Sequence, residues 1–142
     1  EDALSATRAA VEEGIVPGGG VALLRSRTAL DAIEAEGDEK TGIMILRTAL
    51  EAPLKLISDN TGVPGVVILA ESDKAEGDWG YDAEAGEFTH LLERGIMDPA
   101  KVTRAAIENS ASVAAMVLTT ESLITDIKEA LPAGPVPPPM DY

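Results

Sequence analysis

The 142-residue sequence contains no cysteine and a single histidine, His90. It therefore cannot form disulfide bonds or a thiolate metal site, and one histidine cannot build a histidine cluster around a metal. Aromatic residues make up only 3% of the chain, so its core must be aliphatic. No apolar run reaches the roughly 18 residues that a membrane span needs, and no signal peptide is recognisable. These absences favour a cytosolic protein and exclude a disulfide-stabilised or membrane-spanning one.

The formal net charge of −14 argues against binding to nucleic acid or to an anionic membrane, because both carry negative charge themselves. Hydrophobic residues make up 45% of the chain, which is enough for one domain with a core. The sequence starts at Glu1 without a methionine and already inside a helical pattern. We therefore expect it to be part of a longer protein.

Apolar residues recur at spacings of three and four through most of the chain, which is typical of amphipathic helices. The pattern predicts helices over residues 2–14, 20–33, 40–60, a short stretch after Pro64, and 99–119. Pro53 lies inside the third of these and should kink or break it. Asp98 is expected to cap the last helix, with Pro99 at its first position.

Two segments have strand-like patterns. Residues 79–88 have aromatic ends around a short glycine-containing loop, which predicts a β-hairpin. Its aromatic residues either hold the hairpin together or contact a ligand. Apolar residues alternate from Leu123 to Ile127, which indicates an edge strand. The proline-rich residues from Pro132 onward predict a flexible or polyproline tail.

The motif Pro17-Gly18-Gly19-Gly20 stands between the first two predicted helices. Consecutive glycines let the backbone approach a ligand closely, and the following helix offers unpaired N–H groups to an anion. We interpret them in this way rather than as a packing solution. The motif lacks the ending of a Walker A loop and is not a GxGxxG fingerprint, so a simple flexible turn is the alternative. Asp2 and Asp98 also have two interpretations each: a residue that caps a helix, or a carboxylate that belongs to a ligand site.

Several segments, taken in order, closely resemble the group I chaperonins of bacteria and organelles. The resemblance covers residues 1 to about 128, and the segments that carry it are 1–20, Leu50-Glu51-Ala52-Pro53-Leu54, Gly80-Tyr81-Asp82-Ala83, 95–104, Ala111-Ser112-Val113-Ala114 and Leu118-Thr119-Thr120-Glu121. It implies a mainly α-helical fold, the C-terminal half of the chaperonin equatorial domain, with a small β-hairpin and a short C-terminal edge strand. Residues 1–12 would end the intermediate domain, 13–128 would belong to the equatorial domain, and 129–142 would form the tail.

The resemblance also implies an adenine-nucleotide site. Asp2 corresponds to the carboxylate that helps to activate the attacking water, and we expect it to be catalytic. The residues expected to bind the nucleotide are Gly18 and Gly19, which would approach it closely, Asp82, Ala83 and Ile96 beside the base, and Asp98 at the ribose. The family commonly has asparagine where this chain has Asp82, and its usual Gly/Met-rich tail is replaced here by a proline-rich one.

The function implied is that of an ATPase chaperone that couples ATP hydrolysis to the encapsulation and refolding of unfolded proteins. ATP and Mg²⁺ would be the cofactors, with the metal ligands mainly in an N-terminal half that this sequence lacks. Subunits would form double heptameric rings through the strand near Leu123 and the surface around Lys55 and Val66. Co-chaperonin and client proteins would bind the absent apical domain. The alternative, which we favour for these 142 residues alone, is a non-catalytic helical assembly fragment.

Overall fold

The computed structural model describes residues 1–126, and the chain is mainly helical, with 59% helix and two small antiparallel sheets. This confirms the predicted fold class. The elements follow one another as α1 (Asp2–Glu13), β1 (Ile15–Pro17), α2 (Val21–Ser26), the 3₁₀ helix η1 (Arg27–Ala32), α3 (Gly37–Ala49), α4 (Ala52–Asn60), α5 (Gly65–Ser72), β2 (Trp79–Asp82), β3 (Glu87–His90), β4 (Met97–Pro99) and α6 (Ala100–Thr119).

Pro53 breaks the long helix predicted over residues 40–60. It lies in the first turn of α4, where its missing N–H costs nothing, so α3 ends before it and α4 begins anew. The helix predicted over 20–33 is correct in place but not in type, because it tightens into a 3₁₀ helix after Ser26. The hydroxyls of Ser26 and Thr28 bind carbonyl oxygens three residues earlier, which competes with regular α-helix geometry.

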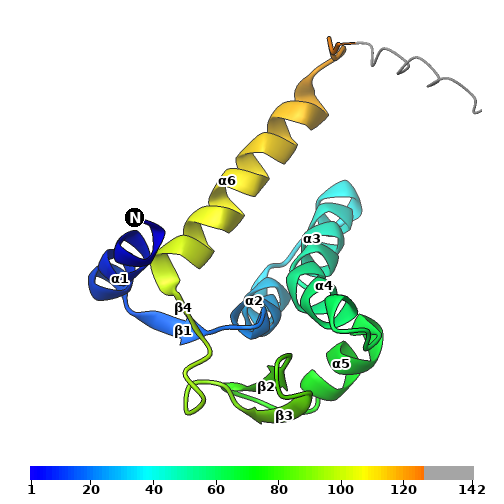
Figure 1. Cartoon of the computed structure of the whole chain (residues 1–142). Helices are drawn as coiled ribbons and strands as arrows, with labels where there is room; N and C mark the ends of the chain where they lie inside the picture. The colour runs from blue at the N-terminus through cyan, green and yellow to red at the C-terminus, as the bar shows by residue number, and fades with distance from the viewer. Residues whose placement is uncertain (127–142) are drawn as a thin grey trace, which may run out of the picture.

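The core lies where α2, α4, α5 and the β2–β3 hairpin meet. Its buried side chains are Val21, Leu24, Leu54, Ile68, Tyr81 and Leu91. Only one of them is aromatic, as the composition predicts. In Figure 1, α3, α4 and α5 follow one another around one side of the molecule, and the hairpin lies at its base.

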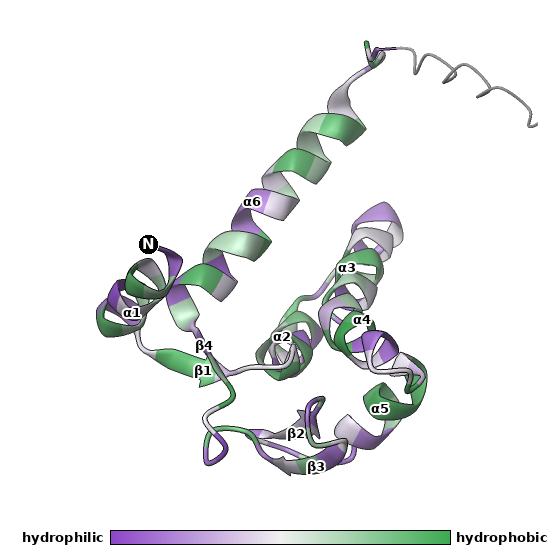
Figure 2. Cartoon of the chain, viewed as in Figure 1, coloured by the Kyte–Doolittle hydropathy of each residue, from purple (hydrophilic) through white to green (hydrophobic). Residues whose placement is uncertain are grey.

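Helix α6 extends away from this core (Figure 1). Its residues from 108 to 119 are all exposed, although Figure 2 shows apolar colour along much of the helix. Helix α3 likewise presents apolar side chains to solvent. The most exposed large hydrophobic residues of these two helices are Met44, Ile45, Val113, Met116 and Leu118. Within residues 1–126, these apolar helix faces are therefore left uncovered.

The predicted hairpin is formed by β2 and β3, which pair antiparallel with Trp79 opposite His90 and Tyr81 opposite Phe88. The rings of each of these pairs are in contact, with centroids 5.0 Å and 5.5 Å apart. The aromatic side chains therefore support the hairpin itself, which is the structural one of the two interpretations offered by the sequence.

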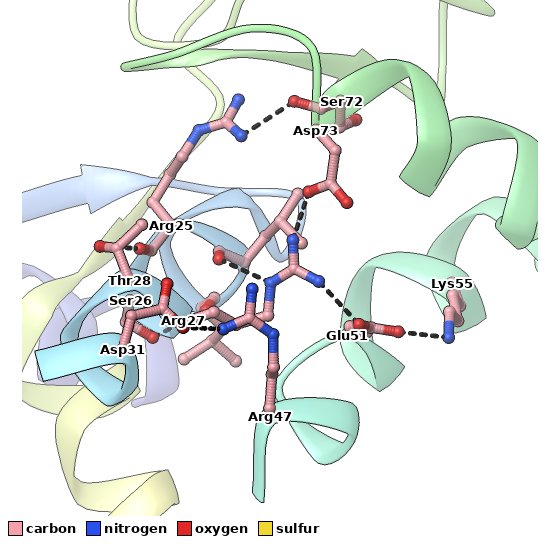
Figure 3. A network of polar contacts seen from close by, with 12 residues as sticks. Arg25, Ser26, Arg27, Thr28, Asp31, Arg47, Glu51, Lys55, Ser72 and Asp73 are labelled. Atoms are coloured by element: carbon pink, nitrogen blue, oxygen red, sulfur yellow. Dashed lines mark hydrogen bonds and ion pairs between the residues drawn. The ribbon is translucent and has the colours of Figure 1, made fainter. Parts of the chain in front are cut away.

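A polar network holds α2 and η1 against α4 and α5 (Figure 3). The Arg27 guanidinium pairs with Glu51 at 2.6 Å and with Asp73, and Glu51 also pairs with Lys55 at 2.6 Å. Hydrogen bonds from Lys55 and Arg27 hold the pKa of Glu51 below its ordinary value. Arg25 donates instead to the carbonyl oxygens of Ser72, Gly77 and Trp79.

The edge strand predicted from Leu123 to Ile127 is not formed over residues 123–126, and Ile127 lies outside the described residues. A strand needs a partner for its backbone hydrogen bonds, and within residues 1–126 no strand lies beside this segment. The predicted proline-rich tail also lies outside the described residues. Across residues 1–126, no helix combines the length and the hydrophobicity that a membrane crossing requires.

Candidate functional site

The glycine loop connects β1 to α2, and two of its glycines are closely packed inside the protein. Gly18 is buried, and a Cβ atom there would lie 3.1 Å from Ile96 Cγ2. A Cβ at Gly20 would lie 2.6 Å from the backbone nitrogen of Leu54. Packing inside the protein, which was not expected from the sequence, therefore accounts for the glycine at position 20 and leaves little room for a side chain at position 18.

Gly19 differs, because a Cβ there would meet only ordinary contacts, the nearest at 3.7 Å. Its φ of +63° lies in the left-handed region, which explains the glycine. The same contacts, to Leu91 and the carbonyl oxygen of Tyr81, show that Gly19 lies against the β2–β3 hairpin. Within the described range, the N–H groups of Gly19 and Gly20 donate to no backbone carbonyl. Neither group donates to a side chain in residues 1–126 either, so both lack an acceptor there.

A second two-stranded sheet, which the sequence did not predict, brings Asp98 to this loop. β1 pairs antiparallel with β4, so that Val16 lies opposite Asp98 and Pro17 opposite Met97. The pairing continues beyond the strands, since the Gly18 N–H donates to the Ile96 carbonyl at 3.0 Å. Gly18, Ile96 and Asp98 are thus brought together from segments about 80 residues apart.

Asp98 does not cap α6, contrary to the prediction. It lies within β4, the N-cap position is taken by Pro99, and no side chain caps the helix. Pairing with β1 extends the strand to Pro99 and moves the helix start by one residue. The exposed Asp98 carboxylate is consequently not used by the N-terminus of α6. It borders a hollow of about 290 Å³ between the glycine loop, α4 and α6, which is also lined by Pro17, Gly20 and Thr103.

Asp82 and Ala83 stand at the end of β2, in the part of the hairpin nearest the turn. Asp82 is buried, and its Oδ1 accepts hydrogen bonds from the backbone N–H groups of Glu84 and Ala85, both at 3.0 Å. These N–H groups, that of Ala85 first, lower the pKa of Asp82. Ala83 is half-buried and packs against the core. The Asp82 carboxylate is therefore used within the hairpin itself.

Asp2 is not brought to the glycine loop. It is exposed in the first turn of α1, and it makes no capping hydrogen bond. The 12 residues of α1 separate it from Gly14, which corresponds to about 18 Å. The opposite end of α1 is tied to α6, because Glu12 pairs with Lys101 and Glu13 pairs with Arg104 at 2.7 Å.

A sequence model described as the TCP-1/cpn60 chaperonin family matches residues 1–128. The chain belongs to this chaperonin family. Among solved structures, the chain is similar to one titled "Crystal structure of group III chaperonin in the open state", with 30% sequence identity and a TM-score of 0.74. That match covers 82% of this chain and 25% of the other, so this chaperonin segment spans about a quarter of the length of its structural relative.

In this chaperonin segment, six of the seven predicted site residues gather around the glycine loop and the hairpin, whereas Asp2 lies apart.

Sequence reasoning missed one residue of this region. Arg94 lies in the loop between β3 and β4, with its Nε 3.6 Å from Asp82 Oδ2. The one sequence signal that could have pointed to Arg94 is Asp82 itself. It replaces the asparagine that is common in the family and so introduces a negative charge, which favours a nearby cation. Residues 1–126 contain no group of three or more His, Asp or Glu side chains that could hold a metal ion.

Proposed function

We propose that this chain is the C-terminal part of a group I chaperonin subunit and supplies one wall of its ATP site. The observation that carries the proposal is the convergence of the glycine loop, Ile96 and Asp98 on the β1–β4 sheet, with the hairpin against Gly19. Free N–H groups suit a phosphate, an apolar side chain suits a base, and an unpaired carboxylate suits ribose hydroxyls. The order of the motif segments quoted above supports group I.

The residues of this chain account for only part of such a site. ATP bound here would carry Mg²⁺, and the described residues offer no cluster of ligands to hold it. We therefore assign the metal and most phosphate contacts to a segment outside this sequence. Residues 1–12 would end the intermediate domain, 13–128 would form the equatorial part and 129–142 the tail. The complete subunit would use ATP to encapsulate and refold client proteins, and its apical domain would bind clients and co-chaperonin.

We assign the catalytic role to Asp2 in a closed arrangement of the arm that α1 forms. A carboxylate on a movable arm can orient the attacking water only when the arm closes, which fits its exposed position about one helix length from the loop. In the complete subunit, Asp2→Ala should slow ATP hydrolysis and leave ATP affinity largely unchanged. Glu1→Ala, which removes the neighbouring carboxylate, is the matched control. A loss of affinity with an unchanged rate constant would show that Asp2 binds the nucleotide instead.

A second candidate, an assembly segment without turnover, is favoured for the 142-residue chain alone by its exposed apolar faces. A groove of about 550 Å³ between α3 and α6 is lined mainly by aliphatic residues, among them Ile45, Ala111 and Leu118. Such a surface is typical of contact with another polypeptide.

In the complete protein, we propose ring assembly into double heptamers. ATP hydrolysis by the isolated chain with Mg²⁺ would contradict the assignment of phosphate and metal chemistry to another segment.

A further inference from the structure

Arg94 reaches from the loop after β3 back to the hairpin. Its Nε lies 3.6 Å from Asp82 Oδ2, and its Nη2 donates to Glu87 Oε1 at 2.8 Å. Asp82 and Glu87 are partners in the β2–β3 register and flank the turn that contains Ala83. A single guanidinium therefore binds the residues on both sides of this turn.

The carboxylate of Asp82 is well suited to hold this arginine. Oδ1 is committed to the N–H groups of Glu84 and Ala85, which leaves Oδ2 toward Arg94. The two N–H groups and Arg94 lower the pKa of Asp82 and so favour its ionised form. Asparagine at this position could accept the same N–H bonds but would offer no charge. The exchange from asparagine to aspartate thus provides a negatively charged partner for Arg94.

The loop that carries Arg94 continues directly into the other half of the candidate site. Ile96 follows two residues later, and its N–H donates to the Leu91 carbonyl at 2.8 Å. The Ile96 carbonyl accepts the N–H of Gly18 at 3.0 Å. A continuous path of contacts therefore runs from Asp82 through Arg94 and Ile96 to the glycine loop. The base-side hairpin and the β4 segment with Asp98 are joined along this path.

We propose that Arg94 is a positioning residue that fixes the hairpin turn relative to the Ile96–Asp98 segment, and so sets the affinity for the adenosine part of the nucleotide. This inference rests on the proposed ATP function. Arg94 would act without touching the nucleotide, through its contacts with the Asp82 and Glu87 side chains of the hairpin. It acts by keeping Ala83 and Ile96 at the spacing that a base requires.

The test is a double-mutant cycle in the complete subunit, with ATP hydrolysis measured as KM and kcat and folding checked by thermal unfolding. The variants are Asp82→Asn, Arg94→Met and the two combined, with Arg94→Lys as the conservative exchange. Lys74→Met, which removes an exposed cation that pairs with Glu71 and not with the hairpin, is the matched control. Arg94 has a half-exposed side chain, so its replacement by methionine leaves no buried void.

We expect Asp82→Asn and Arg94→Met each to raise the KM for ATP about threefold, the effect of losing a partly exposed ion pair, with kcat unchanged. The double variant should be no worse than Arg94→Met alone, because both changes remove the same interaction. Arg94→Lys should restore most of the affinity, and Lys74→Met should match the parent.

Several outcomes would overturn the inference. They are an unchanged KM in Arg94→Met, additive effects in the double variant, a KM for Arg94→Lys as high as for Arg94→Met, or tighter ATP binding in Asp82→Asn. In each of these cases the parent still hydrolyses ATP, so the proposed function survives. Absence of ATP binding and hydrolysis in the parent subunit would instead refute the proposed function, and this inference with it.

Discussion

The glycine loop allows a quantitative test, because Gly20 combines two separate demands. Its φ of +79° disfavours any residue with a Cβ, and that Cβ would lie 2.6 Å from the Leu54 nitrogen and 2.9 Å from the Leu54 Cα. The left-handed conformation costs an alanine about 1–2 kcal/mol, and overpacking against a backbone that cannot easily move adds about 1–3 kcal/mol. Gly20→Ala should therefore destabilise the α2–α4 contact by about 2–5 kcal/mol.

Two other glycines separate these contributions. Gly19→Ala imposes the left-handed strain without a close contact, so it should cost about 1–2 kcal/mol. Gly65 has no positive φ, but its Cβ would lie 2.5 Å from the Lys55 carbonyl oxygen where α5 crosses α4, so Gly65→Ala should cost about 1–3 kcal/mol through overpacking alone.

Hydrogen exchange of the α2 and α4 amides in the complete subunit measures these costs locally, which avoids the multistate unfolding of a large protein. Since 1.4 kcal/mol corresponds to a tenfold change, Gly20→Ala should accelerate their exchange by about 30-fold or more. The reasoning would be refuted if Gly20→Ala exchanged no faster than Gly19→Ala. The Leu54 backbone would then have moved aside at no cost, and the close approach would not explain the glycine.

Two further predictions concern titration. Lys55 and Arg27 lower the pKa of Glu51 in the folded state, so this carboxylate stabilises the fold above its ordinary pKa of 4.5 and ceases to do so as pH falls through the lowered value. Glu51→Gln should therefore make the free energy of unfolding less dependent on pH in the acid range. An unchanged pH dependence would contradict the assigned network. The hydrogen bond with Asp78 raises the pKa of His90, and the His90 ring contacts Trp79, the single tryptophan of this sequence. Trp79 fluorescence should therefore titrate with a midpoint above pH 6.5, and Asp78→Asn should lower that midpoint. A midpoint that does not move would show that the His90–Asp78 pair is not formed in solution.

Local sequence signals predicted the local structure well. Pro53 removes a backbone donor wherever it stands, and it breaks the long helix as expected. Gly14 ends α1 at its predicted C-terminus. The alternation and aromatic residues of the hairpin depend on near neighbours, so β2 and β3 were recognisable before any tertiary contact was known.

Features that depend on distant segments could not be predicted in this way. The β1–β4 pair joins three-residue strands about 80 positions apart, too short and too distant for any periodicity to indicate. It also explains the error at Asp98, since an Asp-Pro pair before a helix normally signals a cap and only the strand partner reassigns it. The close packing at Gly18 and Gly20 is similarly nonlocal, because the atoms that would meet a side chain there belong mainly to Ile96 and Leu54.

The candidate site was also predictable only in part. Motif order brought six of its residues together without any geometry, but motif matching cannot say how a side chain is occupied. Asp82 was expected at the base, and its carboxylate is bound within its own hairpin. Arg94 belongs to no motif, so only the folded chain shows that it lies beside Asp82.

The short β1–β4 sheet also has a mechanical consequence. The Ala100 N–H donates to the Gly14 carbonyl at 3.0 Å, so the end of α1 and the start of α6 are fastened to each other at the strands that carry Asp98. Asp2 lies at the opposite end of α1 from this point. A rotation of about 10° there would carry Asp2 through about 3 Å, given a helix of about 18 Å. Small movements of the strands beside Asp98 would thus become displacements of several ångströms at Asp2.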